Sequence, residues 1–214
     1  MTIHGLILAG GRSSRFGREK AAAEIDGRPM LARIADGLTP HVAALAVNAP
    51  PERWAARFAA EHGLPLLPDA PGDPDGPLSG VKAGLAWARA AGAELLVSAP
   101  CDTPFLPADL VSRLAQALTP EAGAATARTT EGLQPLCTLW RCDRLEAVQA
   151  ALAGGEHPAI RKVLAGLGAV EVGFDDARAF DNINTPQDLT NSLPPRRGKG
   201  GDGGECRAPD DRDA

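Results

Sequence analysis

Residues 6–20, LILAGGRSSRFGREK, join a short apolar segment to a basic loop that contains glycine. An apolar run leading directly into Gly10 and Gly11 is typical of a buried parallel strand followed by a sharp turn. Glycine lets the backbone approach a ligand closely, and successive amides of such a turn can bind phosphate oxygens. We therefore predict that this loop surrounds the phosphates of a nucleotide. The alternative is an ordinary tight turn with solvated arginines.

The common nucleotide-binding motifs do not describe this loop. A Walker motif needs Gly-Lys followed by Ser or Thr, and this combination occurs nowhere in the chain. Gly10, Gly11 and Gly17 do not have the Gly-x-Gly-x-x-Gly spacing of the dinucleotide fingerprint. Phosphate binding here would therefore use a third geometry. Lys20 and Arg15 are the candidate cations, and each could contact a phosphate as a positive charge.

Composition limits the class of protein. A chain of 214 residues with 44% hydrophobic and 23% charged residues fits one globular domain. The net charge of −5 gives no reason to expect nucleic acid as a partner, and no apolar run is long enough for a membrane span. The four cysteines include no Cys-x-x-Cys pair, which argues against a structural zinc. The N-terminus lacks a signal-peptide pattern, so we expect a cytoplasmic protein.

The composition changes abruptly near the C-terminus. From Pro194 onward the chain is rich in Pro, Arg, Gly, Asp and Lys and contains almost no apolar residues. Such a segment cannot bury enough apolar surface to become ordered. We therefore predict one domain over residues 1–193 and a disordered tail over residues 194–214.

Strand and helix patterns alternate over most of the chain. Predicted strands cover residues 3–8, 41–47, 64–67, 95–99 and 169–174, with an antiparallel pair at 122–127 and 133–140. Predicted helices cover residues 29–38, 51–61, 80–91, 107–118, 143–152 and 159–167. A last helix opens at Thr185, with Asp188 three residues after the cap. This alternation predicts a three-layer α/β fold, Rossmann-like, with a mostly parallel sheet.

Polar residues follow the ends of several predicted strands, where ligands bind in an open parallel sheet. Asp102 follows the apolar strand 95–99 and is flanked by two prolines. A rigid carboxylate at this place suits Mg²⁺, which takes one or two carboxylates together with substrate phosphates. Asn182 and Asn184 are candidates for a neutral oxygen ligand of the same ion. The alternatives are an Asx turn at Asp102 and local turn capping by the asparagines.

Three further positions are candidate nucleotide contacts. Asn48 could bind a sugar hydroxyl or a base, and Asp69 could accept from a purine N–H group; both also fit ordinary strand or turn ends. Gly80 lies in a small-residue segment before a helix, whose amino-terminal amides favour an anion, with simple capping by Ser79 as the alternative. No Ser-His-Asp or Cys-His set is suggested. Nucleotidyl transfer needs little acid–base chemistry, because positioning, a metal ion and cations do most of it.

Four motifs, in order along the chain, carry a resemblance. The stretch Leu8-Ala-Gly-Gly with Ser13, Arg15, Gly17 and Lys20 resembles the signature loop of the nucleotidyltransferase superfamily. With the segments 76–80 (GPLSG), 100–104 (PCDTP) and 182–186 (NINTP), the chain is similar to the molybdenum cofactor guanylyltransferases from about Gly5 to Leu193. The loop before Lys20 is slightly shorter than in some members, and Ser79 replaces their usual alanine.

The resemblance implies a reaction and a set of roles. Members of this family transfer GMP from GTP to the molybdenum–molybdopterin cofactor with Mg²⁺ and release pyrophosphate. The implied GTP contacts are Leu8, Ala9, Gly10, Lys20, Asn48, Asp69 and Asp102, and Gly11 and Gly80 are further candidates for the same nucleotide. The candidate catalytic residues are Lys20, Asp102 and Arg15. The resemblance implies that Asp102 binds Mg²⁺, and Asn182 and Asn184 are further candidate metal ligands from their position in the chain. Candidate contacts for the pterin are Arg128, Gln134, Arg161 and Lys162, with plain surface positions as the alternative.

Two rival functions stay open. Cytidylyltransferases that act on the same cofactor tend to carry Leu-Ala-Ala-Gly, and the second glycine here, Gly11, would make room for a purine. A non-catalytic pterin-binding chaperone would not need a metal carboxylate together with Lys20. We expect a monomer whose protein partners deliver the cofactor or mature molybdoenzymes.

Overall fold

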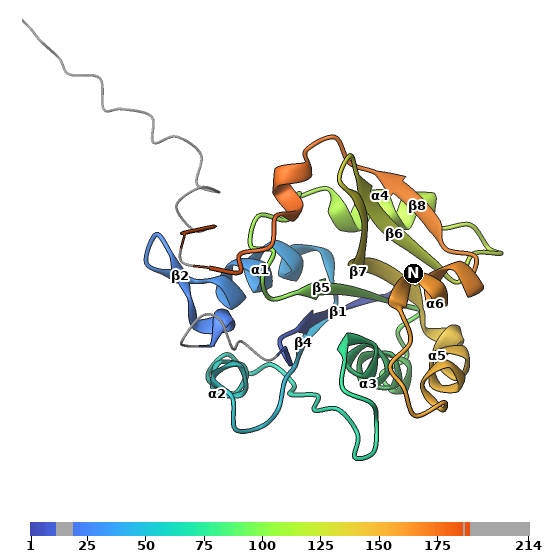
Figure 1. Ribbon diagram of the computed structural model, residues 1–214, viewed down its shortest axis with the longest axis horizontal. Coiled ribbons are helices and arrows are strands. Elements are labelled where there is room, and N and C mark those ends of the chain that lie inside the picture. The colour runs from blue at the N-terminus through green and yellow to red at the C-terminus, as the bar shows by residue number, and fades with distance from the viewer. Residues whose placement is uncertain (12–18, 186, 189–214) are drawn as a thin grey trace, which may run out of the picture.

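A mostly parallel sheet forms the centre of the fold. The computed structural model of the chain describes residues 1–11, 19–185 and 187–188. Among these residues one sheet has six strands in the order β4-β1-β5-β7-β6-β8. They are β4 (Ala44–Asn48), β1 (Ile3–Leu8), β5 (Leu95–Pro100), β7 (Gly132–Arg141), β6 (Ala124–Thr129) and β8 (Val170–Gly173). Only β7 runs against the others (Figure 1). The predicted sheet type and the antiparallel pair are confirmed.

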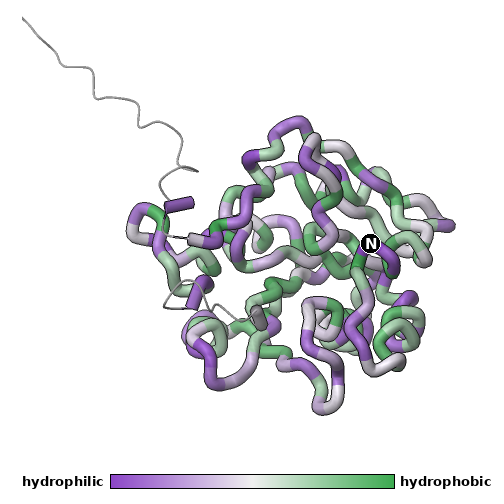
Figure 2. The backbone as a smooth tube through the Cα atoms, viewed as in Figure 1, coloured by the Kyte–Doolittle hydropathy of each residue, from purple (hydrophilic) through white to green (hydrophobic). Residues whose placement is uncertain are grey.

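Helices cover both faces of this sheet, as predicted. Along β1 the side chains alternate, so Ile7 packs into one hydrophobic cluster while Leu6 and Leu8 pack into the other. The helices that pack with Ile7 are α1 (Met30–Leu38), α2 (Trp54–Glu61) and α4 (Leu110–Ala117). The helices on the opposite face are α3 (Pro77–Ala90), α5 (Leu145–Leu152) and α6 (Ile160–Gly166). Figure 2 shows hydrophobic stretches along the central strands between these layers.

A small two-stranded hairpin follows Lys20 in the chain and lies beside the main sheet. The 3-10 helix η1 (Lys20–Ala22) leads into the two-stranded sheet of β2 (Glu24–Ile25) and β3 (Arg28–Pro29). Ala23, Ile25 and Met30 form a third hydrophobic cluster with Ile183 from the C-terminal part of the described chain. Residues 23–30 are therefore packed against Ile183, close in sequence to Lys20 and to Asn184.

Prolines account for one wrong prediction. The predicted strand over residues 64–67 is absent, because Leu66 forms only an isolated bridge with Val47. Pro65 and Pro68 have no N–H group to continue a ladder, which limits the pairing to this point.

Several other boundaries differ from the prediction. The strand expected from His41 begins at Ala44, because η2 (Thr39–His41), with Pro40 at its start, comes first. The helices expected from Pro51 and Pro107 begin three residues later, at Trp54 and Leu110. Helix α3 begins earlier than expected, with Pro77 in its first turn, where the missing N–H costs nothing. Two further 3-10 helices are η3 (Cys142–Arg144) and η4 (Ala177–Phe180).

The described helices give no sign of a membrane span. None of them is both long enough and apolar enough to cross a bilayer. The predicted tail over residues 194–214 lies outside the described residues, so its disorder stays a prediction.

His4, on β1, is expected to make stability depend on pH. The imidazole is buried against Trp87, and Nδ1 has no hydrogen-bond partner within the described chain. Burial lowers the pKa of His4, so below about pH 6.5 the unfolded chain binds the proton more readily than the folded chain. The free energy of unfolding should fall as the pH drops from 7.5 to 5.5, by at most about 1.4 kcal/mol per pH unit for this one proton. Urea unfolding of the wild type and His4→Leu measures this, and equal slopes in both proteins would contradict it.

Candidate active site

The carboxyl ends of three neighbouring strands bring the predicted residues together. In the register of the sheet, Leu8 at the end of β1 pairs with Asn48 on β4 and with Pro100 on β5. The glycines after β1 and Asp102 after β5 therefore lie at the same edge as Asn48. Ligands bind at this edge in sheets of this kind.

One cavity opens between the glycine turn, the end of β4 and the start of α3. Its volume is about 610 Å³, which suits a small organic ligand. The lining residues are Gly10, Gly11, Asn48, Pro50, Glu52, Arg53, Asp69, Asp75, Gly76 and Pro77. We call this cavity the first cavity.

Asn48 and Asp69 form a hydrogen-bonded pair in the first cavity. The side chain of Asn48 is only 4% exposed in this fold, and its amide nitrogen donates to Asp69 Oδ1 and to the carbonyl of Leu67, both at 2.8 Å. Asp69 itself is exposed. A buried amide thus fixes one oxygen of an accessible carboxylate, which leaves the other oxygen oriented for a ligand N–H group.

A second, smaller cavity lies on the other side of the glycine turn. Its volume is about 210 Å³. The lining residues are Leu8, Gly10, Gly11, Lys20, Pro77, Pro100, Cys101, Asp102 and Leu136. The two cavities share Gly10, Gly11 and Pro77, so a ligand in one would lie next to a ligand in the other.

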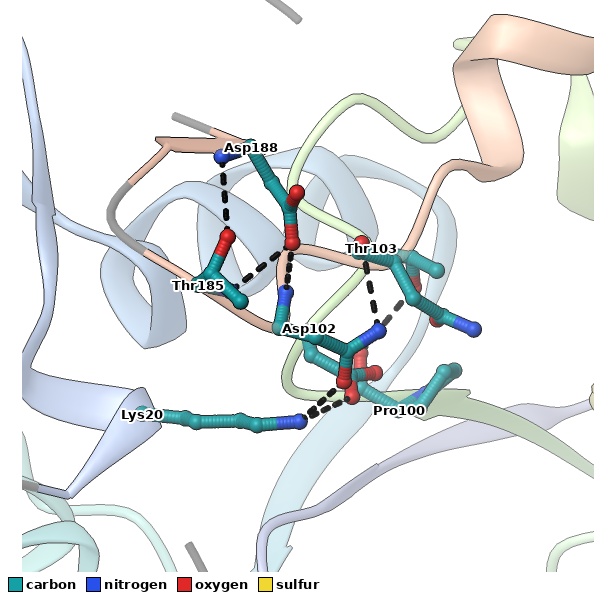
Figure 3. Close-up of polar contacts among 8 residues, drawn as sticks. Lys20, Pro100, Asp102, Thr103, Thr185 and Asp188 are labelled. Atoms are coloured by element: carbon teal, nitrogen blue, oxygen red, sulfur yellow. Dashed lines mark hydrogen bonds and ion pairs between the residues drawn. The ribbon is translucent and has the colours of Figure 1, made fainter. Parts of the chain in front are cut away.

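Lys20 and Asp102 form an ion pair at the second cavity. Lys20 Nζ lies 3.3 Å from Asp102 Oδ2, and the two side chains are 20% and 22% exposed. Asn184 Oδ1 accepts a second hydrogen bond from Lys20 Nζ at 2.5 Å. Figure 3 shows the Lys20 side chain extended toward Asp102 from across the site. The three groups combine one cation with two oxygen donors, close to the glycine turn.

Backbone contacts hold Asp102 in place. The N–H of Ile183 donates to the carbonyl of Asp102 at 2.8 Å, and Ile183 is fully buried in the third hydrophobic cluster. Thr103 Oγ1 donates to the carbonyl of Pro100 at 3.1 Å and closes the turn from the other side (Figure 3). The carboxylate therefore projects from a rigid turn, as catalysis by positioning requires.

The neighbouring thiol is not a nucleophile. Burial, and to a smaller extent the negative charge of Asp102, raise the pKa of Cys101 to about 12 against the opposing effect of Lys20. Because the thiolate is the reactive form, Cys101 stays inert at neutral pH. Among the described residues that line the second cavity, the charged side chains are those of Lys20 and Asp102.

A family model for the MobA-like NTP transferase domain matches residues 5–171. This chain belongs to that family. The molybdenum cofactor guanylyltransferase of Cereibacter sphaeroides is 46% identical to this transferase over 190 residues, which cover 88% of this chain and 94% of the relative. The protein of the same name from Rhodobacter capsulatus is 44% identical over 191 residues, with the same coverage of each chain. The structure of molybdopterin-guanine dinucleotide biosynthesis protein A from Archaeoglobus fulgidus has the same fold, with a TM-score of 0.72, 20% identity and coverage of 88% and 96%.

The sequence-derived site residues of this NTP transferase are mostly gathered at the two cavities. Those that line a cavity are Leu8, Gly10, Gly11, Lys20, Asn48, Asp69 and Asp102. Ala9 is buried beneath the glycine turn, where its N–H donates to the carbonyl of Asn48 at 2.8 Å. Asn182 contributes a carbonyl oxygen to Asn184 Nδ2 at 3.4 Å. Arg15 lies outside the described residues, so its role stays a prediction.

Three of the four candidate pterin contacts make other interactions. The guanidinium of Arg128 pairs with Glu171, and Arg161 donates to the carbonyl of Leu133 at 3.4 Å. The amide nitrogen of Gln134 donates to Thr129 Oγ1 at 3.4 Å. Lys162 is exposed on α6. Within residues 1–11, 19–185 and 187–188 these interactions do not reach the residues that line the two cavities, and the role of the four side chains in pterin binding stays a prediction.

The site also contains residues that the sequence did not single out. Arg53 lines the first cavity from the start of α2. His157 comes from a distant loop, and its Nε2 accepts from the N–H of Leu78 at 3.0 Å, at the amino end of α3. A Cβ on Gly76 would lie 2.2 Å from the His157 ring, so the wall shared with α3 requires glycine there. These contacts join segments far apart in sequence, and no local sequence pattern predicts them.

Gly80 of this transferase is expected to tolerate no side chain. A Cβ at this position would lie 2.2 Å from Asn48 Oδ1 and 2.8 Å from Leu8 Cδ2. Because Asn48 is buried and bound to Asp69, Gly80→Ala should lower the free energy of unfolding by about 1–3 kcal/mol. Denaturant unfolding measures this change. The matched control is Gly37→Ala in α1, where nothing lies within 4 Å of the added Cβ and a gain of about 0.5–1 kcal/mol is expected. Equal effects of the two substitutions would refute the packing argument.

Proposed function

We propose that this transferase transfers GMP from GTP to the molybdenum–molybdopterin cofactor, forming the guanine dinucleotide and releasing pyrophosphate. The observation that carries the proposal is the Lys20–Asp102 pair at the second cavity, which shares the wall of Gly10 and Gly11 with the first. A nucleotide in the first cavity would bring its phosphates to this wall. The cofactor would then approach from the side of Asp102. The names of the most similar relatives support the same reaction.

Recognition of guanine is assigned to the first cavity. Guanine presents N1–H and N2–H side by side, whereas cytosine has no such pair of adjacent donors. The Asp69 carboxylate, with one oxygen fixed by Asn48 at 2.8 Å, is suited to accept from such donors. Gly11 lines both cavities and adds no side chain between them, which favours a large base. These features support GTP over CTP as the donor.

The transfer step itself needs little proton chemistry. An oxygen of the cofactor forms a bond to the α-phosphorus of GTP, and the bond from this phosphorus to the bridging oxygen breaks as pyrophosphate leaves. Lys20 would neutralise charge on the phosphate oxygens, with Arg15 as a second candidate cation. The rigid turn of Asp102 would hold the reacting groups in line. No thiol takes part in this step, which agrees with the inert Cys101.

A divalent cation fits the donor set of the site, and we propose Mg²⁺. Asp102 and Asn184 each direct an oxygen toward the same point, where Lys20 Nζ supplies the positive charge in this structure. Across residues 1–11, 19–185 and 187–188, no group of three or more His, Cys, Asp or Glu is arranged to hold a metal. Mg²⁺ requires few protein ligands because substrate phosphates and water complete its shell. Asp102 would hold the ion, with Asn184 or Asn182 as a neutral ligand, and the ion would neutralise charge on the phosphates.

Several broader expectations remain proposals of the same kind. They are a single domain over residues 1–193, a monomer in the cytoplasm, and protein partners that deliver the cofactor or mature molybdoenzymes. Each rests on composition or on the family resemblance.

A nucleotide competition tests the proposed function. Purified protein is mixed with the loaded molybdopterin cofactor, Mg²⁺, and either GTP or CTP, and pyrophosphate release is followed. Turnover with GTP alone is expected. Turnover with CTP alone would instead identify a cytidylyltransferase, and tight binding of the cofactor without turnover would identify a chaperone.

A further inference from the structure

Thr185 and Asp188 form a helix cap close to the ion pair of Lys20 and Asp102, which we call the catalytic pair. One carboxylate oxygen of Asp188, Oδ2, accepts from the N–H groups of Asn184 and Thr185, both at 2.8 Å. In return, Thr185 Oγ1 accepts from the N–H of Asp188 at 3.2 Å (Figure 3). This reciprocal arrangement is a capping box, and it confirms the predicted cap at Thr185, while the rest of the predicted last helix lies outside the described residues. The box fixes the backbone at Asn184.

Two contacts lead from this backbone to the catalytic pair. The side chain of Asn184 accepts from Lys20 Nζ at 2.5 Å. The preceding residue, Ile183, donates its N–H to the carbonyl of Asp102 at 2.8 Å. Figure 3 shows Thr185 and Asp188 above the point where the end of Lys20 reaches Asp102. A shift of residues 183–184 would therefore be transmitted to both members of the ion pair.

We infer that Asp188 is a positioning residue for nucleotidyl transfer, acting through Asn184 on Lys20 and through Ile183 on Asp102. The inference rests on the proposed function for its kinetic consequence. A charged carboxylate suits this role, because hydrogen bonds from N–H groups to a carboxylate are shorter and stronger than those between neutral groups. In the described chain the Asp188 carboxylate accepts hydrogen bonds from the backbone N–H groups of Asn184 and Thr185, and the charge of Lys20 also attracts it through space. Its effect on the positions of Lys20 and Asp102 therefore passes through Asn184 and Ile183.

Three variants separate this role from a general effect on folding. Asp188→Asn keeps the shape and removes the charge. Asp188→Glu keeps the charge and places glutamate at the position where capping boxes commonly carry it. The matched control is Asp176→Asn, because Asp176 Oδ1 likewise accepts from a backbone N–H, that of Arg178 at 3.1 Å, at the start of η4. If Asp188→Asn fails to fold, Thr185→Ala removes the hydroxyl half of the same box and replaces it in the test.

The first measurement does not depend on the proposed function. The rate at which an acylating reagent modifies Lys20 is followed by peptide mass spectrometry, with Lys82 as the internal reference because it is paired with Asp73 at 2.5 Å. Losing a hydrogen bond to the ammonium should raise the rate at Lys20 about tenfold in Asp188→Asn. Asp188→Glu and Asp176→Asn should match the wild type. An unchanged rate at Lys20 in Asp188→Asn overturns the inference.

The second measurement is steady-state kinetics of GMP transfer. Because a misplaced reacting group slows chemistry more than binding, kcat should fall at least about tenfold in Asp188→Asn while KM for GTP changes little. Asp188→Glu should restore kcat, and the control should leave it unchanged. A loss that appears in KM alone, or an equal loss in Asp176→Asn, overturns the positioning role. If the wild type transfers no GMP, the proposed function fails, and the labelling of Lys20 still decides whether Asp188 positions it.

Discussion

Replacing Asp102 by alanine should reduce the rate of GMP transfer by about 10³-fold or more, because the site loses the carboxylate proposed to hold the metal ion. Asp102→Asn should lose nearly as much, since the amide keeps the shape and removes the charge. Folding should be preserved in both variants, because the turn is held by the backbone contact with Ile183. Pyrophosphate release under saturating GTP and Mg²⁺ measures the effect.

Asp109→Ala is the control for Asp102. Its carboxylate, exposed at the start of α4, pairs with Arg113 at 3.6 Å, so this variant also loses an ion pair, away from the residues that line the two cavities. It should retain wild-type turnover. Near-normal activity of Asp102→Ala at saturating Mg²⁺ would sink the proposed role of Asp102.

The second large effect is expected at Lys20. Lys20→Ala should lower kcat/KM for GTP by about 10²–10³-fold, because no other cation in the described part of the second cavity replaces its charge. Lys20→Arg should recover only part of this loss, since a planar guanidinium does not replace a compact ammonium between Asp102 and Asn184.

Arg28→Ala is the control for Lys20. Arg28 is an exposed cation on the neighbouring hairpin and is paired with Asp36, so its removal changes the charge of the same region without touching the site. Its kinetics should equal those of the wild type. Unchanged kinetics of Lys20→Ala would show that its ammonium does not contact the phosphates.

Local patterns were sufficient for much of the fold. The apolar run of β1, the alternation of strands with helices and the turn between β6 and β7 each reflect a property of consecutive residues. The prediction was wrong where prolines limit strand pairing, as in the expected strand over residues 64–67. There the hydrophobicity favoured a strand, and the missing N–H groups limited it to one bridge.

The candidate site was likewise predicted only in part. The sequence placed Asp102, Asn48 and the glycine turn at one edge, because ligands bind at the carboxyl ends of parallel strands. It did not indicate that Asn48 fixes Asp69, that His157 caps α3, or that Glu19 Oε2 accepts from the N–H of Trp54 at 2.7 Å. Each of these contacts depends on where two distant segments pack.

By itself the sequence determined the class of fold, the glycine turn after β1 and the residue types available for nucleotidyl transfer, because these follow from periodicity and from side chains next to one another in the chain. The tertiary structure alone decided how those groups meet. Lys20 and Asn184 are 164 residues apart in sequence and 2.5 Å apart in space. That contact exists because the order of strands in the sheet and the burial of Ile183 bring residues 20–30 and 183–184 together, and neither property is encoded in any single stretch of residues.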